Sequence, residues 1–162
     1  MTGKIKLLIT DDEVKFLDSI SQRLELRGFE VIKACNGEEA LKAARESRFD
    51  LAILDLKMPG MDGKQVLEKL KSCHKHIEVI MLTGHGSLDS AVECTKLGAF
   101  GYLPKPYELE KLIEMLKDAY EARMQKKFKD DNERVNKIMK MAVGRSPLDI
   151  LKELRKLDDD EK

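Results

Sequence analysis

The sequence predicts an α/β domain with a doubly wound, five-stranded parallel sheet, and three observations lead to this fold class. Short apolar runs alternate with longer segments of helical spacing, so that each of five expected strands is followed by an expected helix. Every connection is long enough to cross over, as parallel neighbours require. The five runs are apolar enough to be read as buried on both faces, which is typical of a sheet covered by helices on both sides.

The composition of the 162 residues suits one such domain with an appendage. Aromatic residues make up only 5%, so the core must be aliphatic. The 30 basic and 30 acidic residues balance, which does not favour a globally basic nucleic-acid binder. No apolar run approaches the roughly 18 residues of a membrane helix. Three cysteines without paired spacing indicate a reduced compartment, and we therefore expect a cytoplasmic protein without membrane contact.

The expected strands are short and stop at polar or turn residues. Asp11 and Asp12 follow the first strand, and Pro59-Gly60 and Asp62-Gly63 follow the third, where neither dipeptide fits a central strand. Asp55 should therefore stand at the carboxyl end of a buried strand and face a loop. The strands are Lys4 to Thr10, Phe29 to Lys33, Asp50 to Asp55, Ile77 to Leu82 and Phe100 to Leu103.

The expected helices carry their apolar residues at a spacing of three and four. Gly28 and Gly98 are helix stops, and Ser87 can cap the fourth helix. Inward positions include Val14 in the first helix and Val92 in the fourth. The helices cover Val14 to Arg27, Glu38 to Ser47, Gly63 to Cys73, Ser87 to Leu97, and a fifth that starts at Tyr107 with Leu109, Leu112, Ile113 and Leu116 on one stripe.

Polar side chains should gather where the strands end, because the carboxyl ends of parallel strands share one edge of the sheet, where ligands bind. Carboxylates that close repel one another unless a cation lies among them, and Mg²⁺ prefers such oxygen ligands. A site of this kind suits a phosphoryl group, with an ammonium and a hydroxyl as further donors. The residues at this edge are Asp11, Asp12, Glu13, Asp55, Thr83 and Lys105.

The arrangement resembles the receiver domain of bacterial two-component response regulators over about residues 4 to 119. The motifs that carry the resemblance are Asp11-Asp12, Asp55 with Met58-Pro59-Gly60-Met61-Asp62-Gly63, Thr83-Gly84 and Lys105-Pro106, in this order and at the expected strand ends. The resemblance implies a flavodoxin-like strand order 2-1-3-4-5. It also implies phosphorelay signalling, in which a sensor histidine kinase or phosphotransfer protein donates a phosphoryl group.

The resemblance assigns a role to each matching residue. Asp55 is the expected phosphoacceptor, and Thr83 and Lys105 are expected to hold phosphoryl oxygens. Mg²⁺ is expected on Asp12, Asp55 and the backbone carbonyl of Lys57, with Asp11 helping through water. Tyr102 occupies the position of the rotating aromatic switch, although a half-buried strand tyrosine would have the same pattern. Lys105-Pro106 is expected to be a cis peptide, and Lys57 and His85 flank the site where water could be admitted.

Residues 83 to 100 look closest to receivers of the nitrogen-regulator class, which usually precede an ATPase and a DNA-binding helix-turn-helix. The sequence departs from that pattern, because it contains no G-x-x-x-x-G-K-[ST] motif. Cys73-His74-Lys75-His76 could offer metal ligands, but a second ligand cluster is missing, and a polar loop is the better interpretation.

Residues 120 to 162 form a helical extension beyond the receiver domain, which we expect at residues 1 to 119. Apolar residues continue at helical spacing through Tyr120, Met124 and Phe128, and resume after a polar stretch with Val135 and Ile138. Gly144 ends this run. Ser146-Pro147 then starts a last helix with Leu148, Leu151, Leu154 and Leu157 on one face.

Two interpretations of the extension stay open. It packs on its own receiver, on a second copy or on a downstream protein, or it is a small output module. Eight basic and four acidic residues between Glu121 and Arg145 keep a DNA-contacting helix as an alternative, although the sequence shows no clear pair of helices that could read DNA. A phosphatase with an aspartyl nucleophile is a further alternative, but it would need an acid two residues after Asp55, where Lys57 stands. We therefore expect a signalling protein rather than an enzyme.

Overall fold

The computed structural model describes residues 3–84, 86–144 and 146–160, and it divides into two units, Met1–Arg123 and Met124–Lys162. We call them the N-terminal and the C-terminal unit. The strands are β1 (Lys6–Thr10), β2 (Glu30–Ala34), β3 (Leu51–Leu54), β4 (Glu78–Thr83) and β5 (Gly101–Pro104). The helices are α1 (Val14–Leu26), α2 (Gly37–Glu46), α3 (Gly63–Cys73), α4 (Leu88–Lys96), α5 (Leu109–Ala142) and α6 (Pro147–Asp160).

The strands form one parallel sheet in the order β2-β1-β3-β4-β5, which confirms the predicted fold class and strand order. The chain winds outward from β1 to β2 and then returns past β1 to β3. The direction of winding therefore changes at the β1–β3 pair, whose carboxyl ends are in register as Thr10 opposite Leu54. In open α/β sheets, this switch point is where ligands bind.

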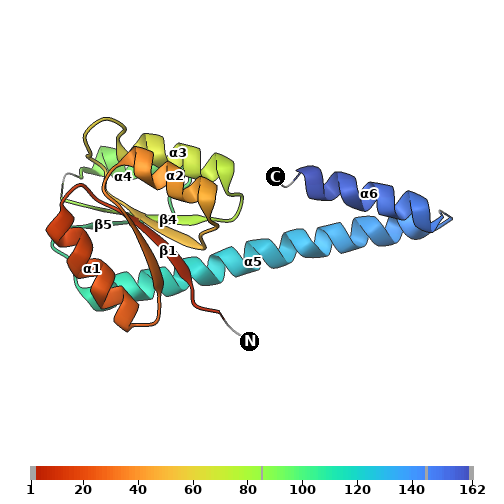
Figure 1. Cartoon of the computed structure of the whole chain (residues 1–162), viewed down its shortest axis with the longest axis horizontal. Coiled ribbons are helices and arrows are strands. Elements are labelled where there is room, and N and C mark those ends of the chain that lie inside the picture. Colours follow the sequence, from red (N-terminus) through yellow and green to blue (C-terminus); the bar gives the residue numbers. More distant parts are fainter. Residues whose placement is uncertain (1–2, 85, 145, 161–162) are drawn as a thin grey trace. The chain divides into compact units, whose positions relative to one another are not determined.

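Helices cover both faces of the sheet (Figure 1). On one face, α2, α3 and α4 enclose a core that includes Leu54, Val66, Leu70 and Cys94. On the other face, α1 and α5 enclose a second core with Leu17, Ile20, Ile53, Leu112 and Leu116. The central strands β3 and β4 are buried along their whole length, because both cores contact them.

The predicted burial is wrong for both edge strands and for one position in each of two helices. Neither β2 nor β5 is buried on both faces, and Ile32 of β2 is 43% exposed, because an edge strand has a neighbour on only one side. In α4, Val92 faces out and Cys94 is the buried residue of the helix. Val14, at the start of α1, is also exposed.

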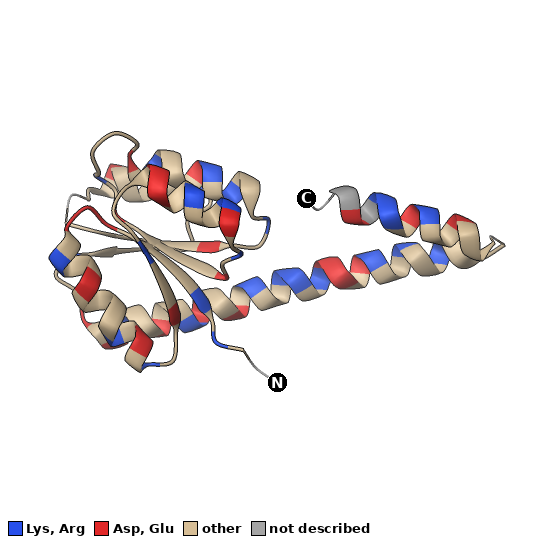
Figure 2. Ribbon diagram, viewed as in Figure 1, with Lys and Arg blue, Asp and Glu red and all other residues tan. Residues whose placement is uncertain are grey.

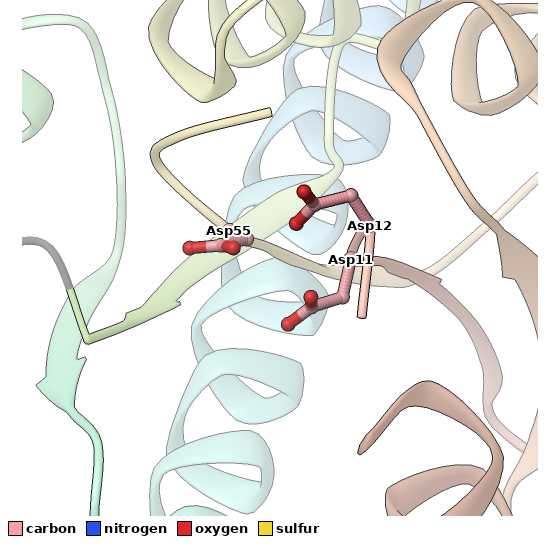
Figure 3. Close-up of side chains that lie close together, drawn as sticks. All are labelled: Asp11, Asp12 and Asp55. Carbon is pink, nitrogen blue, oxygen red and sulfur yellow. The ribbon is translucent and has the colours of Figure 1, made fainter. Parts of the chain in front are cut away.

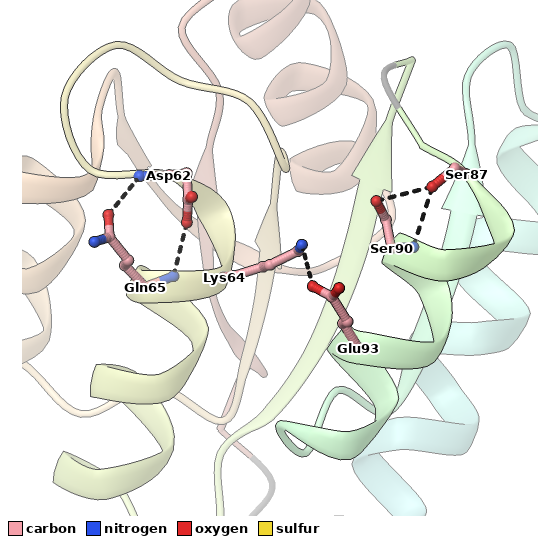
Figure 4. Close-up of polar contacts among 6 residues, drawn as sticks. All are labelled: Asp62, Lys64, Gln65, Ser87, Ser90 and Glu93. Atoms are coloured by element: carbon pink, nitrogen blue, oxygen red, sulfur yellow. Dashed lines mark hydrogen bonds and ion pairs between the residues drawn. The ribbon is translucent and has the colours of Figure 1, made fainter.

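Helix caps follow the local sequence closely. Asp62 and Gln65 form a reciprocal capping box at the start of α3, in which the Gln65 amide donates to Asp62 Oδ1 over 3.0 Å and the Asp62 amide donates to Gln65 Oε1 over 3.1 Å (Figure 4). Ser87 caps α4 as predicted, because its hydroxyl oxygen accepts from the Ser90 amide over 3.1 Å. These caps fix where the two helices leave the edge that carries the polar residues.

The fifth helix runs without interruption from Leu109 to Ala142, so the polar stretch at residues 129–134 does not break it. It starts two residues later than predicted, because Tyr107 instead packs edge-on against the Phe16 ring at 6.2 Å between centroids. Gly144 follows α5 with a φ of +78°. Ser146 then caps α6, because its hydroxyl oxygen accepts a hydrogen bond from the Asp149 amide. Among the described residues, no helix combines the length and hydropathy that a membrane crossing needs.

The C-terminal unit is a pair of helical segments, the later part of α5 and the whole of α6. Arg134 on α5 and Asp158 on α6 join them through an ion pair of 2.6 Å. Both helices carry basic and acidic residues (Figure 2). The side chain of Leu157, which we predicted on the apolar face of α6, lies outside the described residues.

Candidate functional site

Three aspartates lie together at the carboxyl ends of β1 and β3. Asp11 and Asp12 follow β1 directly, and Asp55 follows β3 (Figure 3). One carboxylate oxygen from each residue lies within 4.8 Å of the other two. In the part of the chain that the structure describes, this is the group of acidic, histidine or cysteine side chains that could hold a metal ion.

Burial makes this cluster electrostatically demanding. Asp11 and Asp55 are each 2% exposed, whereas Asp12 is open to solvent. Burial is the main cause that raises the pKa of Asp55, and the negative charge of Asp11 raises it further. A hydrogen bond with the Thr83 hydroxyl, the charge of Lys105 and the Leu56 amide each lower it in part. The Oδ1 atom of Asp55 is buried and has no hydrogen-bond partner among the described residues. A cation would satisfy this oxygen and keep the carboxylate ionised.

Lys105 lies across the sheet from this cluster and points into it. Its ammonium donates to Asp11 Oδ2 over 2.6 Å, and the same nitrogen lies 3.9 Å from the centre of the Phe16 ring. The Lys105-Pro106 peptide bond is cis, as predicted. With the Lys105 ammonium included, the three carboxylates leave two negative charges, which one divalent cation balances. The donor set of carboxylate oxygens is the one that Mg²⁺ prefers.

The loop after β3 returns closely to the backbone that carries Asp55. The Gly63 amide donates to the Leu56 carbonyl over 2.8 Å. A Cβ atom at Gly63 would lie 2.2 Å from the Asp55 carbonyl oxygen, so a side chain at this position would meet backbone. The Met58 to Gly63 turn is therefore packed against the residue that it follows, which fixes the height of Asp55 above the sheet edge.

The remaining predicted residues take different positions. Thr83 ends β4 and is fully buried next to Asp55. Tyr102 lies on β5 and packs partly against the core under α4. The side chain of Lys57 is exposed, and so is that of Glu13. His85, which we expected to flank the site, lies outside the described residues.

The segment from Cys73 to His76 does not join the aspartate cluster. Cys73 is the exposed last residue of α3, and the His74 ring shares a 2.8 Å hydrogen bond between Nε2 and the Ala44 carbonyl. That bond ties α3 to the end of α2, which supports the interpretation of a polar loop over that of a metal site.

Sequence reasoning missed two members of the site. One is Phe16 of the first helix, whose ring contacts Lys105, a residue far away in the chain. Gly63 was read as turn chemistry alone, without its close approach to Asp55. No local pattern in the sequence carries either contact.

The chain belongs to the response regulator receiver domain family, whose model matches residues 7–117. Sporulation initiation phosphotransferase F of Bacillus subtilis is 34% identical over 112 residues, which cover 69% of this chain and 90% of that protein. Transcriptional regulatory protein ZraR of Salmonella typhimurium is 37% identical over 117 residues, but this chain spans only 26% of it.

Solved structures agree with this assignment. The CheY-like receiver domain protein of Methanospirillum hungatei is 34% identical with a TM-score of 0.74, over 76% of this chain and 99% of that one. NtrX of Brucella abortus is 30% identical with a TM-score of 0.73, but the match covers 29% of its chain. The protein is therefore a response regulator with a phosphoacceptor receiver domain for two-component signalling, a family that takes part in exchange with histidine kinases or phosphotransfer proteins and binds Mg²⁺ in an acidic pocket.

Proposed function

We propose that Asp55 is the phosphoacceptor and that residues 1 to 119 carry out the transfer. The observation that carries this proposal is the placement of Asp55: it is buried, it has an unpartnered oxygen, and Thr83 and Lys105 flank the same edge of the sheet. A carboxylate oxygen of Asp55 attacks phosphorus, the bond from phosphorus to the donor's histidine nitrogen breaks, and the imidazole leaves. The Thr83 hydroxyl and the Lys105 ammonium then hold oxygens of the transferred group.

We propose Mg²⁺ as the cation, held by Asp12, Asp55 and the Lys57 carbonyl, with Asp11 acting through water. When bound, the ion neutralises charge on the phosphoryl oxygens. Asp12 is the exposed member of the cluster, and it can therefore admit a hydrated ion from solvent. Asp11 already accepts from Lys105 and from the Glu13 amide over 2.9 Å, which leaves it less free to bind a cation directly.

The test of the acceptor uses the full chain, acetyl phosphate and Mg²⁺, with intact mass as the readout. The wild type should gain one phosphoryl group and Asp55→Asn none. Asp50→Asn is the matched control, because Asp50 precedes the same strand at its other end and should keep full labelling. A gain that survives in Asp55→Asn would sink the assignment.

Two further measurements bear on the chemistry. Calorimetric Mg²⁺ binding should be lost in Asp12→Ala and kept in Asp18→Ala, where the aspartate instead pairs with Lys33 at the surface. Incubation with a phosphomonoester should give no more than one labelled equivalent. Turnover of many equivalents would instead support a phosphatase.

We propose the cytoplasm as its site of action, because Cys35, Cys73 and Cys94 are all free thiols. Thiols stay reduced in the cytoplasm, whereas they tend to form disulfides outside it.

We further propose that the C-terminal unit carries output by pairing with a second copy of this chain. The large apolar residues of this unit that are open to solvent are Met124, Phe128, Val135, Met139, Val143, Leu148 and Leu151. Each is worth roughly 1.5–3 kcal/mol if buried. Both α5 and α6 carry basic and acidic residues, so an identical unit offers charges of the opposite sign (Figure 2).

This second proposal is tested by light scattering on the full chain across a concentration series, with and without a phosphoryl mimic. Phe128→Glu should shift the population toward monomer, whereas Gln125→Glu adds the same charge to a polar position on the same turn and should not. Equal masses for wild type and Phe128→Glu would reject pairing. If Phe128→Glu leaves the mass of the chain unchanged but abolishes its binding to a downstream protein, the unit docks on that partner instead.

A further inference from the structure

The buried hydroxyl end of Tyr102 lies against the backbone of Gly86, and we call the space that it fills the niche. Its hydroxyl oxygen is buried. Burial is the main cause that raises the pKa of this phenol, and a hydrogen bond with the Ser87 backbone opposes it. The ring itself packs against the core that contains the buried Cys94 of α4.

Gly86 forms the wall of this niche. A Cβ atom on Gly86 would lie 1.6 Å from the Tyr102 hydroxyl oxygen and 2.6 Å from ring atom Cζ, so no side chain fits while the tyrosine is there. The backbone of Gly86 does not have the positive φ that favours glycine elsewhere in the chain. Alanine at this position is therefore free of backbone strain, and its effect would come from the contact with Tyr102 alone.

We propose that Gly86 is a positioning residue for Tyr102, because its missing side chain leaves the space that keeps the ring inside. The hydroxyl reaches the Ser87 backbone only while residue 86 has no side chain, so the space at Gly86 decides whether the ring can stay inside. A methyl group at residue 86 would fill the niche and force the side chain to another staggered rotamer. The identity of residue 86 thus sets the resting position of the tyrosine.

This inference rests on the proposed function, in which Tyr102 is the switch of the domain. Thr83 begins the connection that contains Gly86, and the Thr83 hydroxyl interacts with Asp55. A ring that cannot enter the niche no longer fills the space under this connection. The phosphorylation-dependent change in the chain should then be lost, although Asp55 stays accessible to a phosphodonor.

The test is NMR of the full chain labelled with ¹³C-tyrosine, without phosphorylation. The three tyrosines give separate ring signals, and Tyr102→Phe identifies that of Tyr102. Gly86→Ala should shift the Tyr102 signal toward that of a solvent-exposed ring and lower the pKa of its phenol toward the ordinary range. Gly84→Ala is the control, because its Cβ would meet only Lys105 Cβ at an ordinary 3.9 Å.

A second arm separates the contact from a general effect on the loop. In a Tyr102→Ala background, Gly86→Ala should change neither thermal stability nor Mg²⁺-dependent phosphorylation, because the clashing ring is gone. If Gly86→Ala alone fails to fold, the double variant should fold again, and its failure would overturn the proposal. An unmoved Tyr102 signal, or an equal shift in Gly84→Ala, would also overturn it.

The outcome is independent of the phosphoacceptor assignment. The ring signal is measured in the unphosphorylated chain, so labelling of Asp55→Asn would reject the proposed acceptor without touching the result on Gly86. A shifted ring with an unchanged response to acetyl phosphate would overturn the link from Gly86 to the switch.

Discussion

Replacing Gly63 by alanine should displace the backbone that carries Asp55 and so disturb the site. The added Cβ would lie 2.2 Å from the Asp55 carbonyl oxygen and 2.8 Å from Leu56 Cα. Both atoms belong to backbone at the end of a buried strand, so no side-chain rotation can relieve the contact. The loop must move away, or the end of β3 must move down.

The cost follows from this geometry. Overpacking in a core costs typically 1–3 kcal/mol, and we expect about 3 kcal/mol because the neighbouring atoms are backbone. The hydrogen bond of 2.8 Å from the Gly63 amide to the Leu56 carbonyl opposes separation of the two segments. Any shift of Asp55 also moves it from Asp11 and Asp12, so Mg²⁺ should bind more weakly.

The assay is thermal unfolding of the full chain, followed by Mg²⁺ titration. About 3 kcal/mol corresponds to a drop of roughly 6–12 °C for a chain of this size. Gly84→Ala makes the same chemical change at a position with ordinary contacts and should stay within about 0.5 kcal/mol of wild type. An unfolding temperature for Gly63→Ala that equals the control would refute the close approach on which this reasoning depends.

Two other predictions concern ion pairs away from the site. Asp50→Asn should lower the free energy of unfolding by about 1–2 kcal/mol in urea titration, because Arg123 pairs with this partly buried carboxylate at 3.2 Å; removal of the exposed Asp18 should cost under about 0.5 kcal/mol. Arg27 lowers the pKa of Glu110 in the folded chain, so this ion pair stabilises the fold above the pKa of an unfolded glutamate, and the stabilisation is lost as the pH falls through the folded pKa. Glu110→Gln should therefore make the unfolding free energy depend less on pH in acid, and an unchanged dependence would contradict this.

The fold could be predicted because its determinants are local. Strand and helix periods, the cap at Ser87 and the stop at Gly144 act over a few residues, and the structure has each of them in place. Parallel topology then brings every strand end to one edge, which is why Asp11, Asp12 and Asp55 could be expected together. Edge effects were harder to predict, because β2 combines the apolar Val31 and Ile32 with the charged Glu30 and Lys33, and its place at the border of the sheet depends on the order of the other strands.

The internal arrangement of the site could not be predicted, because it depends on which side chains meet across elements. Lys105 could have been expected near any of the three carboxylates, and the structure pairs it with Asp11 while its ammonium also lies over Phe16. Gly86 likewise follows no local rule: its backbone does not need glycine, and only the position of Tyr102 explains why a side chain is missing there.

Among the helices that cover the sheet of the N-terminal unit, α4 contributes least to the core, which makes it the element best suited to move. It buries Cys94 alone, whereas α5 buries Leu112, Ile113, Leu116 and Ala119 in the same unit. An ion pair between Lys64 of α3 and Glu93 of α4 adds an exposed contact, which is worth little in water (Figure 4). Hydrogen exchange should therefore be faster in α4 than in α1 or α3 of the unphosphorylated chain. Equal protection in these helices would mean that α4 is held by more than its buried surface, and that the response to phosphorylation must start elsewhere.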